Sequence, residues 1–354
     1  MIQSLAIGST VRDTYTILEK LGEGAFSEVF LVRHRFLGLQ AMKVFKSNSL
    51  SPTSDQFREA FLLSKIAHPN IVRIFEANKI SGSDGDRSYV TMEHAAGGTL
   101  HSFLSSRPLL SLEMVVRIQT QICAGLSAAH SQRPPIIHRD IKPQNILITS
   151  VEEDCTVKVA DFGLAKNIDP RLRMVSAAGT LLYMPPEGFH HYETPASDVY
   201  SAGIILYEML TGTFPFPVVE YASEQEFRLG LAKTRALIPP APSTVRPSVP
   251  RALDEVSLLA LQPDIKKRFQ SAVEFLSALD SLESRSKATQ SPPNPTSTKK
   301  GTAELKAKEA ILIGKQYAEL PSAIRLLEEA LLDDPGLRNQ YGEVLARWKS
   351  GVVL

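Results

Sequence analysis

Apolar and polar residues alternate in five short runs within the first hundred residues of the chain. The runs cover residues 16–20, 28–34, 40–45, 71–76 and 89–93. A two-residue period with β-branched and aromatic side chains is typical of half-buried strands. Between the third and fourth runs, residues 54–66 place Phe57, Ala60 and Phe61 at helical spacing. The pattern therefore predicts a small lobe of five strands and one helix.

Beyond residue 99 the apolar residues recur every three or four positions, which is the period of an amphipathic helix. Helices are predicted over residues 113–131, 194–210, 224–231, 253–261 and 271–282. Gly97 and Gly98 lie where the pattern changes, and we expect the hinge between two lobes there. The predicted fold class of residues 15–283 is α+β, with a β-rich lobe and a larger helical lobe after an N-terminal extension of residues 1–14.

Residues 284–303 are predicted to form a linker. They contain Pro292, Pro293 and Pro295 among many Ser, Thr and Lys residues, and almost no large apolar side chains. Such a composition cannot form a packed core and is typical of connecting segments. We therefore expect the chain to divide into a principal domain before this linker and a separate module after it.

Residues 304–354 return to a helical pattern. Ala323, Leu327, Ala330 and Pro335 are spaced as in the second helix of a tetratricopeptide repeat, whereas residues 304–317 fit the first helix of that repeat poorly. A single repeat cannot bury both of its faces without a neighbour. Two interpretations stay open: a repeat-like module, or a plain helical hairpin packed on the preceding domain or on a protein partner.

The composition argues against several classes of protein. The 354 residues carry a formal net charge of +1, which provides no strong field for a nucleic acid or a membrane surface. No apolar run approaches the ~18 residues of a membrane span, and residues 1–10 lack the pattern of a signal peptide. Two cysteines make no disulfide framework. We expect no nucleic-acid partner, no membrane span and a cytoplasmic location.

The most informative chemistry lies in two short segments. The first is H-R-D-I-K-P-Q-N at residues 138–145, and the second is D-F-G at residues 161–163. Together they supply two carboxylates and an amide, whose oxygen atoms suit a hard divalent cation, and a lysine, which suits a phosphate group. This set indicates phosphoryl transfer from a nucleoside triphosphate, a reaction that depends mainly on positioning and charge neutralisation.

A glycine-rich segment, L-G-E-G-A-F-S-E-V at residues 21–29, precedes these two. Glycines let backbone N–H groups approach phosphates closely, but a similar pattern also occurs in dinucleotide-binding turns, which open a helix. Here Val29, Phe30 and Val32 follow, and they favour a strand. We therefore expect a phosphate-binding hairpin, in which Ser27 takes the place of a third glycine.

The motifs H-R-D-x-K-x-x-N and D-F-G, in this order after the glycine-rich loop, resemble the signature of eukaryotic-type protein kinases. The resemblance covers roughly residues 15–283, and the runs F-P-F at 214–216 and R-F-Q-S-A at 268–272 are most similar to bacterial members. It implies the bilobal protein kinase fold, followed here by a short α-helical tail. It also implies a serine/threonine protein kinase that phosphorylates proteins, with the chain itself among its substrates.

The resemblance implies catalytic roles for three residues. Asp140 would orient the substrate hydroxyl and accept its proton, and Lys142 would neutralise charge on the transferred phosphoryl group. Thr180, in the run G-T at residues 179–180, would hydrogen-bond near both of them. Lysine at 142 and G-T at this place are typical of serine/threonine kinases.

Lys43 and Glu59 complete the catalytic set that the resemblance implies, and Asn145 and Asp161 would hold the metal ion of the cofactor. By resemblance, Asn145 and Asp161 would bind Mg²⁺, with Mn²⁺ as a substitute, on the phosphates of ATP. Lys43, at the end of Q-A-M-K, would contact the α- and β-phosphates. Glu59 would hold the ammonium group of that lysine in place.

The nucleotide would lie between the two lobes. Val29, Ala41 and Leu147 would sandwich the adenine ring, while Met92 would border the pocket behind it. The backbone of Glu93 and Ala95 would face the edge of the ring. The complete set of residues that the resemblance assigns to ATP is Leu21, Gly22, Glu23, Gly24, Ala25, Phe26, Ser27, Val29, Ala41, Lys43, Met92, Glu93, Ala95 and Leu147.

Residues 161–187 resemble an activation segment, which ends in G-T-L-L-Y-M-P-P-E. Ser176 lies at the usual site of phosphorylation, and Arg139 and Lys166 would neutralise the added phosphate and order the segment. The alternative is that Ser176 is an unmodified loop serine.

The same resemblance implies two interactions inside the helical lobe. Glu187 would form a buried ion pair with Arg268, and Asp198 would brace the backbone of residues 138–145. Both expectations concern residues far apart in the sequence, so they depend on the fold and not on local patterns.

Two other functions fit the chain less well. A pseudokinase, acting as a scaffold through residues 304–354, would be expected to lack Lys43, Asp140, Asn145 or Asp161, and all four are present. Phosphotransfer to a small molecule is disfavoured because residues 179–187 resemble a segment that cradles a peptide. The sequence identifies neither the protein substrate nor the activating signal.

Overall fold

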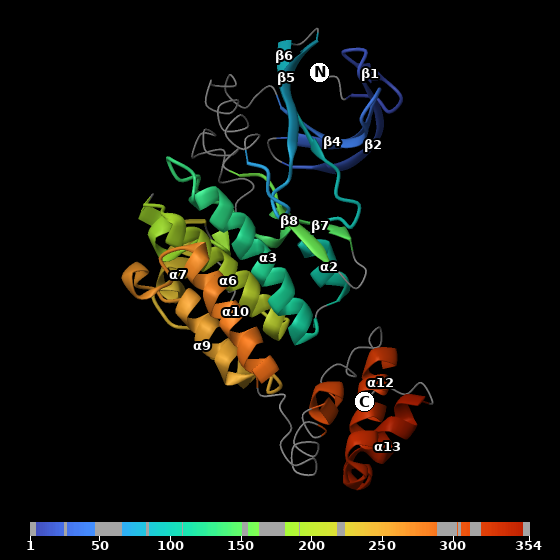
Figure 1. The fold of residues 1–354 in the computed structure, drawn as a ribbon, viewed down its shortest axis with the longest axis vertical. Coiled ribbons are helices and arrows are strands. Elements are labelled where there is room, and N and C mark those ends of the chain that lie inside the picture. The colour runs from blue at the N-terminus through green and yellow to red at the C-terminus, as the bar shows by residue number, and fades with distance from the viewer. Residues whose placement is uncertain are drawn as a thin grey trace.

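The protein has a β-rich lobe, a helical lobe and a small helical group at the C-terminal end (Figure 1). The computed structural model describes residues 5–24, 27–46, 66–82, 85–107, 109–150, 155–162, 181–190, 192–217, 224–288, 303, 306–311 and 320–349. Across these residues the predicted α+β class is confirmed. Among them, no helix is long and apolar enough to cross a membrane.

The first lobe contains an antiparallel sheet. Its strands are β1 (Thr10–Val11), β2 (Tyr15–Glu23), β3 (Ser27–His34), β4 (Gly38–Phe45), β5 (Ile74–Gly82) and β6 (Gly85–Glu93), in the order β1-β2-β3-β4-β6-β5. Five of these strands match the predicted runs. The two-residue strand β1 was not predicted, because two residues are too few to show an alternating pattern.

The start of β5 differs from the prediction, which began the strand at residue 71. Ile71 instead forms an isolated parallel bridge with Val159, and the Val72 N–H donates to the Val159 carbonyl at 3.0 Å. The Val159 N–H in turn donates to the Asn70 carbonyl at 2.9 Å. Residues 70–72 therefore pair with the second lobe and attach the sheet to it.

Strands β3 to β6 contribute to two separate cores, because successive side chains point to opposite faces of a sheet. Phe30, Met42 and Val44 belong to a cluster on one face, together with Tyr15, Ile17, Val32 and Tyr89. Their sequence neighbours Val29 and Ala41 belong to a cluster on the other face, together with Phe45, Val90 and Met92. The second cluster also contains Ala160 and Leu147, so this face is turned toward the second lobe.

The second lobe is mainly helical. It contains α2 (Leu100–Ser106), α3 (Leu112–His130), α6 (Pro195–Thr211), α7 (Glu224–Arg235), α8 (Pro242–Val245), α9 (Arg251–Ala260) and α10 (Ala272–Ala288). A small antiparallel pair, β7 (Ile146–Ser150) and β8 (Thr156–Val159), lies at its upper end. The long predicted helices are found within a few residues of their expected bounds. α10 continues past residue 284, where the linker was expected to begin.

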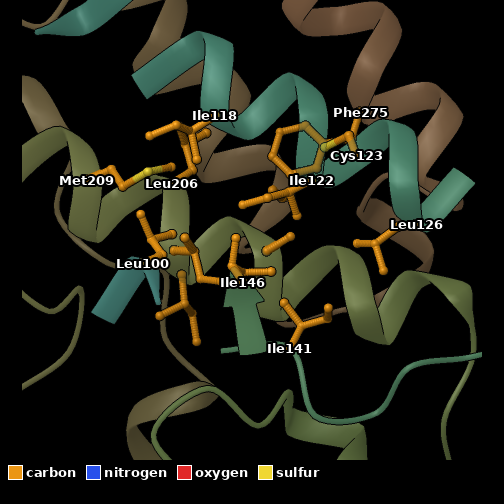
Figure 2. Close-up of a cluster of buried hydrophobic side chains, with 14 of the residues drawn as sticks. Leu100, Ile118, Ile122, Cys123, Leu126, Ile141, Ile146, Leu206, Met209 and Phe275 are labelled. Atoms are coloured by element: carbon orange, nitrogen blue, oxygen red, sulfur yellow. The ribbon is translucent and has the colours of Figure 1, made fainter. Parts of the chain in front are cut away.

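The core of this lobe surrounds α3 and α6 (Figure 2). α3 contributes Ile118, Ile122, Cys123 and Leu126, which all lie at 0 % exposure. Leu206 and Met209 come from α6, Phe275 from α10 and Ile146 from β7. Burying each side chain of this size stabilises the fold by roughly 1.5–3 kcal/mol. Ile141 also points into this core, so its side chain attaches the segment 138–145 to the core of the second lobe.

Both cysteines of the chain are buried. Cys123 lies in the core at 0 % exposure and Cys155, beside β8, at 2 % exposure. Burial raises the pKa of each thiol above its usual value. The thiols are therefore neutral packing groups at physiological pH.

The chain passes between the lobes through two glycines, as predicted. The Gly97 N–H donates to the Ile148 carbonyl at 2.8 Å, and the Ile148 N–H donates to the Gly98 carbonyl at 2.8 Å. A Cβ atom on Gly97 would lie 2.6 Å from the Ile148 carbonyl oxygen. Gly98 has a φ of +76°, in the left-handed region that favours glycine. The crossing can approach β7 this closely only without side chains.

The C-terminal group forms a core of its own. Helical residues 306–311 pack with α12 (Leu320–Asp333) and α13 (Arg338–Lys349). Their shared core contains Ala307, Ala310, Ala323, Leu327 and Ala330, and it is closed by Trp348. Arg246 of the second lobe forms an ion pair with Glu309 of this group. Whether the group is repeat-like or a plain hairpin stays open.

A buried ion pair joins two distant parts of the second lobe, as predicted. The guanidinium of Arg268 donates to Glu187 at 2.8 Å and to the Ala196 carbonyl at 2.9 Å. It also lies over the Tyr200 ring, 4.6 Å from the centroid. The Arg268 side chain is 0 % exposed, so its charge depends on Glu187 for compensation.

We predict that Glu187→Gln lowers the free energy of unfolding by roughly 3–5 kcal/mol, because it leaves Arg268 charged and buried. Urea unfolding measures the change. Glu113→Gln is the control, since Glu113 pairs with Arg117 on the surface with its side chain 83 % exposed. The control should change the same free energy by less than about 0.5 kcal/mol. Equal losses in the two variants would contradict the prediction.

Candidate active site

A single carboxylate holds the segment 138–145 in place. Asp198, in the first turn of α6, accepts hydrogen bonds from the backbone N–H groups of His138 at 2.7 Å and Arg139 at 2.8 Å. Nε2 of His130 lies 2.8 Å from the same carboxylate. Burial by itself would raise the pKa of Asp198, but the contact with His130 and these N–H groups lowers it overall. The predicted bracing role is confirmed.

Two non-glycine residues at this site have left-handed backbones. Arg139 has a φ of +69° and Asp161 has a φ of +60°. Such a conformation costs about 1–2 kcal/mol for an ordinary side chain, so the surrounding contacts must maintain it. The hydrogen bond from the Arg139 N–H to Asp198 is one of these contacts.

His138 connects the two motif segments. Its Nδ1 accepts a hydrogen bond from the Asp140 N–H at 3.2 Å, so the proton of the neutral ring is on Nε2. Nε2 then donates to the Ala160 carbonyl at 2.8 Å, next to Asp161. The ring also packs on Phe162, with centroids 4.5 Å apart. The imidazole is fully buried and acts as a spacer between the segments.

Two predicted catalytic residues, Asp140 and Lys142, lie together with the predicted metal ligand Asn145. Lys142 Nζ lies 2.8 Å from Asp140 Oδ2, and Asn145 Nδ2 donates to the same oxygen at 3.0 Å. Asn145 Nδ2 also donates to the Asp140 backbone carbonyl at 2.7 Å. These contacts fix the orientation of the Asp140 carboxylate. A group oriented in this way can accept a proton from a hydroxyl at a defined position.

Lys43 and Asp161 form an ion pair across the two lobes. Lys43 Nζ on β4 lies 2.7 Å from Asp161 Oδ1, just after β8. Burial would raise the pKa of Asp161, but the Lys43 charge and hydrogen bond lower it overall, so the carboxylate is ionised at neutral pH. The expected partner of Lys43, Glu59, lies outside the described residues. The pairing with Asp161 was not predicted.

The oxygen donors of this site fit a divalent metal bound together with a nucleotide. Asn145 and Asp161 contribute amide and carboxylate oxygens, which are the ligands that Mg²⁺ prefers. They are too few for a site made of protein ligands alone, and Mg²⁺ sites of this kind are completed by phosphate oxygens and water. The ammonium groups of Lys43 and Lys142 lie against the carboxylates of Asp161 and Asp140.

The predicted adenine-binding residues also come together. Val29 and Ala41 from the sheet pack in one cluster with Leu147 of β7 and with Met92. A small pocket opens behind Met92, and its walls are Val72, Ile74, Met92, Val159, Ala160, Asp161 and Phe162. The cluster brings apolar side chains of both lobes together, which suits a flat, partly polar ring.

The connection beside this pocket is held by Glu93. Its N–H donates to the Arg73 carbonyl at 2.9 Å, and its carboxylate lies 3.1 Å from Lys158 Nζ on β8. This ion pair joins the end of β6 to the second lobe. Sequence reasoning identified Glu93 for its backbone alone and missed Lys158, since the two lie far apart in the sequence. Ala95 accepts a hydrogen bond from the Gly98 N–H.

The glycine-rich loop is a hairpin between β2 and β3, as predicted. The Gly24 N–H donates to the Ser27 carbonyl at 2.8 Å, close to the tip. No atom lies within 4 Å of a Cβ built on Gly22, so packing does not require glycine there. The open space is where a phosphate could approach the backbone. Leu21 and Glu23 lie in β2 beside these glycines, while Ala25 and Phe26 lie outside the described residues.

Of the proposed regulatory residues, the structure describes Arg139. Its Nε lies 2.8 Å from a carboxylate oxygen of Glu193, and both side chains are about one-quarter exposed, at 23 % and 25 %. Glu193 was not predicted, because no local pattern links it to Arg139. Ser176 and Lys166 lie outside the described residues, as does the predicted catalytic residue Thr180.

Comparison with known proteins gives one consistent result. Residues 15–340 match the family model described as protein kinase domain. "Probable serine/threonine-protein kinase PknB" of Lactococcus lactis is 34 % identical over 281 residues, which cover 77 % of this chain and 42 % of that protein. Serine/threonine-protein kinase pkn3 of Myxococcus xanthus is 34 % identical over 303 residues, which cover 81 % and 53 % of the two chains. The chain thus spans about half or less of these relatives.

Solved structures agree with these relatives. The crystal structure of the Mycobacterium tuberculosis PknI kinase domain is similar at a TM-score of 0.59 and 26 % identity, covering 78 % of this chain and 99 % of that one. The resemblance inferred from the motifs and the predicted bilobal fold are both confirmed.

We predict that Asp198→Asn destabilises the protein in a pH-dependent way. The folded-state pKa of Asp198 is lowered, so its stabilising contribution is present above the unfolded pKa of about 3.9 and is lost as the pH falls through the folded value. Asparagine would direct an NH₂ group at one of the two backbone N–H donors. The loss at pH 7 should be roughly 3–5 kcal/mol and should shrink as the pH falls below about 4.

Urea unfolding of both proteins across this pH range measures the difference. Asp264→Asn is the matched control, because Asp264 is an exposed cap of a 3₁₀ helix and asparagine caps equally well. A difference between wild type and Asp198→Asn that stays constant with pH would refute the explanation.

Proposed function

Because the chain belongs to the protein kinase family, we propose that it is a serine/threonine protein kinase, which transfers the γ-phosphate of ATP to protein hydroxyl groups. The single observation that carries the proposal is the group formed by Asp140, Lys142 and Asn145 opposite the Lys43–Asp161 ion pair. A pseudokinase would be expected to lack one of these residues.

Protein kinases use ATP and a divalent metal ion. We propose that the metal is Mg²⁺, with Mn²⁺ as a substitute, and that Asn145 and Asp161 hold it. The bound metal would neutralise the phosphate oxygens and align them for transfer. Lys43 would turn from Asp161 to the α- and β-phosphates when a nucleotide binds. Val29, Ala41 and Leu147 would enclose the adenine ring.

In the proposed reaction, Asp140 orients the substrate hydroxyl and receives its proton. Its carboxylate is suited to this because Lys142 and Asn145 fix it from one side. Lys142 then stabilises the negative charge on the transferred phosphoryl group. Lysine at 142 and threonine at 180 favour serine and threonine as acceptors. A protein partner for residues 304–354 and a cytoplasmic location stay predictions.

We also propose that phosphorylation of Ser176 controls activity through Arg139 and Lys166. The contact between Arg139 and Glu193 adds a condition to this proposal. An added phosphate has to compete with the Glu193 carboxylate for the guanidinium. Its charge of about −1.5 to −2 makes it the stronger partner.

We predict that wild-type protein transfers label from radioactive ATP with Mg²⁺ to itself and to a generic basic protein as acid-stable phosphoserine or phosphothreonine. Asp140→Asn should lower the rate by roughly 100-fold or more, because the positioned base is lost. Asp161→Ala should abolish transfer. Asp264→Asn, on the surface, should transfer at the wild-type rate. An inactive wild type that is folded and binds ATP would contradict the proposal and favour a scaffold acting through residues 304–354.

For regulation, we predict that Ser176→Ala removes one phosphate from the intact mass after incubation with ATP, and that it lowers activity on an added substrate. The substitution Glu193→Gln in the wild-type protein removes the carboxylate that competes for Arg139. It should shorten the incubation with ATP that gives half of the maximal activity. An unchanged phosphate count and unchanged activity in Ser176→Ala would refute this role.

A further inference from the structure

Two glutamates face each other at the mouth of the glycine-rich loop. Glu23 of β2 and Glu28 of β3 are direct partners in the antiparallel register, so their side chains share one face of the sheet. Like charges placed directly opposite each other destabilise a strand pair. In isolation, this pair would push apart the two strands that carry the loop.

Each of the four carboxylate oxygens of the two glutamates contacts a cationic side chain. Lys20 Nζ bridges the pair, 2.5 Å from Glu23 Oε2 and 2.9 Å from Glu28 Oε1. Lys46 lies 2.5 Å from the remaining oxygen of Glu23, and Arg87 Nη2 lies 2.7 Å from that of Glu28. The five side chains form one linear ion-pair network of alternating charge, and Lys20 lies at its centre.

This ion-pair network connects the loop to the strands that form the rest of the nucleotide site. Lys46 follows the end of β4, the strand that carries Lys43. Arg87 is on β6, which ends at Glu93, and its Nε also donates to the Phe45 carbonyl at 3.3 Å. The loop is therefore attached through charge to both neighbouring elements of the site.

The side chains of the ion-pair network differ in how deeply they are buried. The side chains of Glu28 and Arg87 are 8 % and 10 % exposed, whereas those of Lys20 and Glu23 are 37 % and 49 % exposed. Burial alone would raise the pKa of Glu28, but Arg87 and Lys20 lower it overall. Hydrogen bonds from Lys20 and Lys46 lower the pKa of Glu23 to about 2. Both glutamates are therefore ionised at neutral pH and need their counter-ions.

We propose that Lys20, Lys46 and Arg87 are positioning residues, which hold β2 and β3 paired at the base of the glycine-rich loop by neutralising Glu23 and Glu28. They act through the loop and do not touch the nucleotide. Without the shared cation, the two carboxylates repel each other and also repel the phosphates that the loop covers. The pairing of β2 and β3 then loosens at the base of the loop, and nucleotide binding weakens more than the transfer step does. The consequence for ATP depends on the function proposed above, whereas the effect on the loop does not.

The test compares Lys20→Met with the double variant Lys20→Met/Glu23→Gln. The single variant leaves two facing carboxylates without their common cation, and the double variant removes one of the two charges. Lys306→Met is the matched control. Lys306 also contacts two carboxylates, Glu329 at 3.4 Å and Asp333 at 2.9 Å, and its side chain is 31 % exposed, but it is in the C-terminal group.

The first measurement is hydrogen exchange of the backbone amides in residues 21–29 without nucleotide. Exchange should be faster in Lys20→Met, restored in the double variant and unchanged in the control. Lys46→Met should change exchange in the same direction by a smaller factor, since Glu23 keeps Lys20. Wild-type exchange in Lys20→Met, or no restoration in the double variant, would overturn the proposal.

The second measurement is calorimetric titration with ATP and Mg²⁺. It is followed by measurement of kcat and of the KM for ATP, with a generic protein as the phosphate acceptor. Lys20→Met should bind ATP about fivefold more weakly, with the same factor in KM and little change in kcat. Faster exchange with unchanged ATP affinity would overturn the positioning role. If wild type itself does not bind ATP, the proposed function fails, and the exchange experiment still decides whether the cations hold the loop.

Discussion

The buried carboxylate of Asp198 is the interaction on which the site depends most. Removing a charge from water is costly, and here two backbone N–H groups and His130 compensate the cost. In return, the carboxylate fixes the backbone at Arg139 in a conformation that an isolated chain would avoid. The direction of Asp140 follows from this backbone, so a residue that contacts no substrate determines where the proposed base points.

Among the described residues of the site, three carboxylates each pair with a lysine. Asp161 pairs with Lys43, Asp140 with Lys142 and Glu93 with Lys158. Two of these pairs, Lys43–Asp161 and Glu93–Lys158, join one lobe to the other. A nucleotide with its metal brings both signs of charge, so it can exchange partners with these residues without leaving a buried charge alone.

Sequence reasoning worked best where function depends on neighbouring residues. Asp140, Lys142 and Asn145 lie within six positions, and their contacts follow from one tight segment. It also placed Val29, Ala41 and Leu147 together, because the family resemblance supplied the fold. Pairs such as Arg139–Glu193 and Glu28–Arg87 were missed, since they arise from the order of strands and the path of loops. The ends of the strands were predicted less accurately. β5 begins later than predicted, because residues 70–72 pair with β8 instead.

The burial of Cys123 and Cys155 has a practical consequence for studying motion. Both thiols are shielded and protonated, so maleimide or nitroxide reagents will react with them slowly. A single cysteine introduced on the surface then becomes the one fast-reacting position. Spectroscopic probes can be attached to either lobe of the native sequence without first removing its own cysteines, and the core around α3 stays intact.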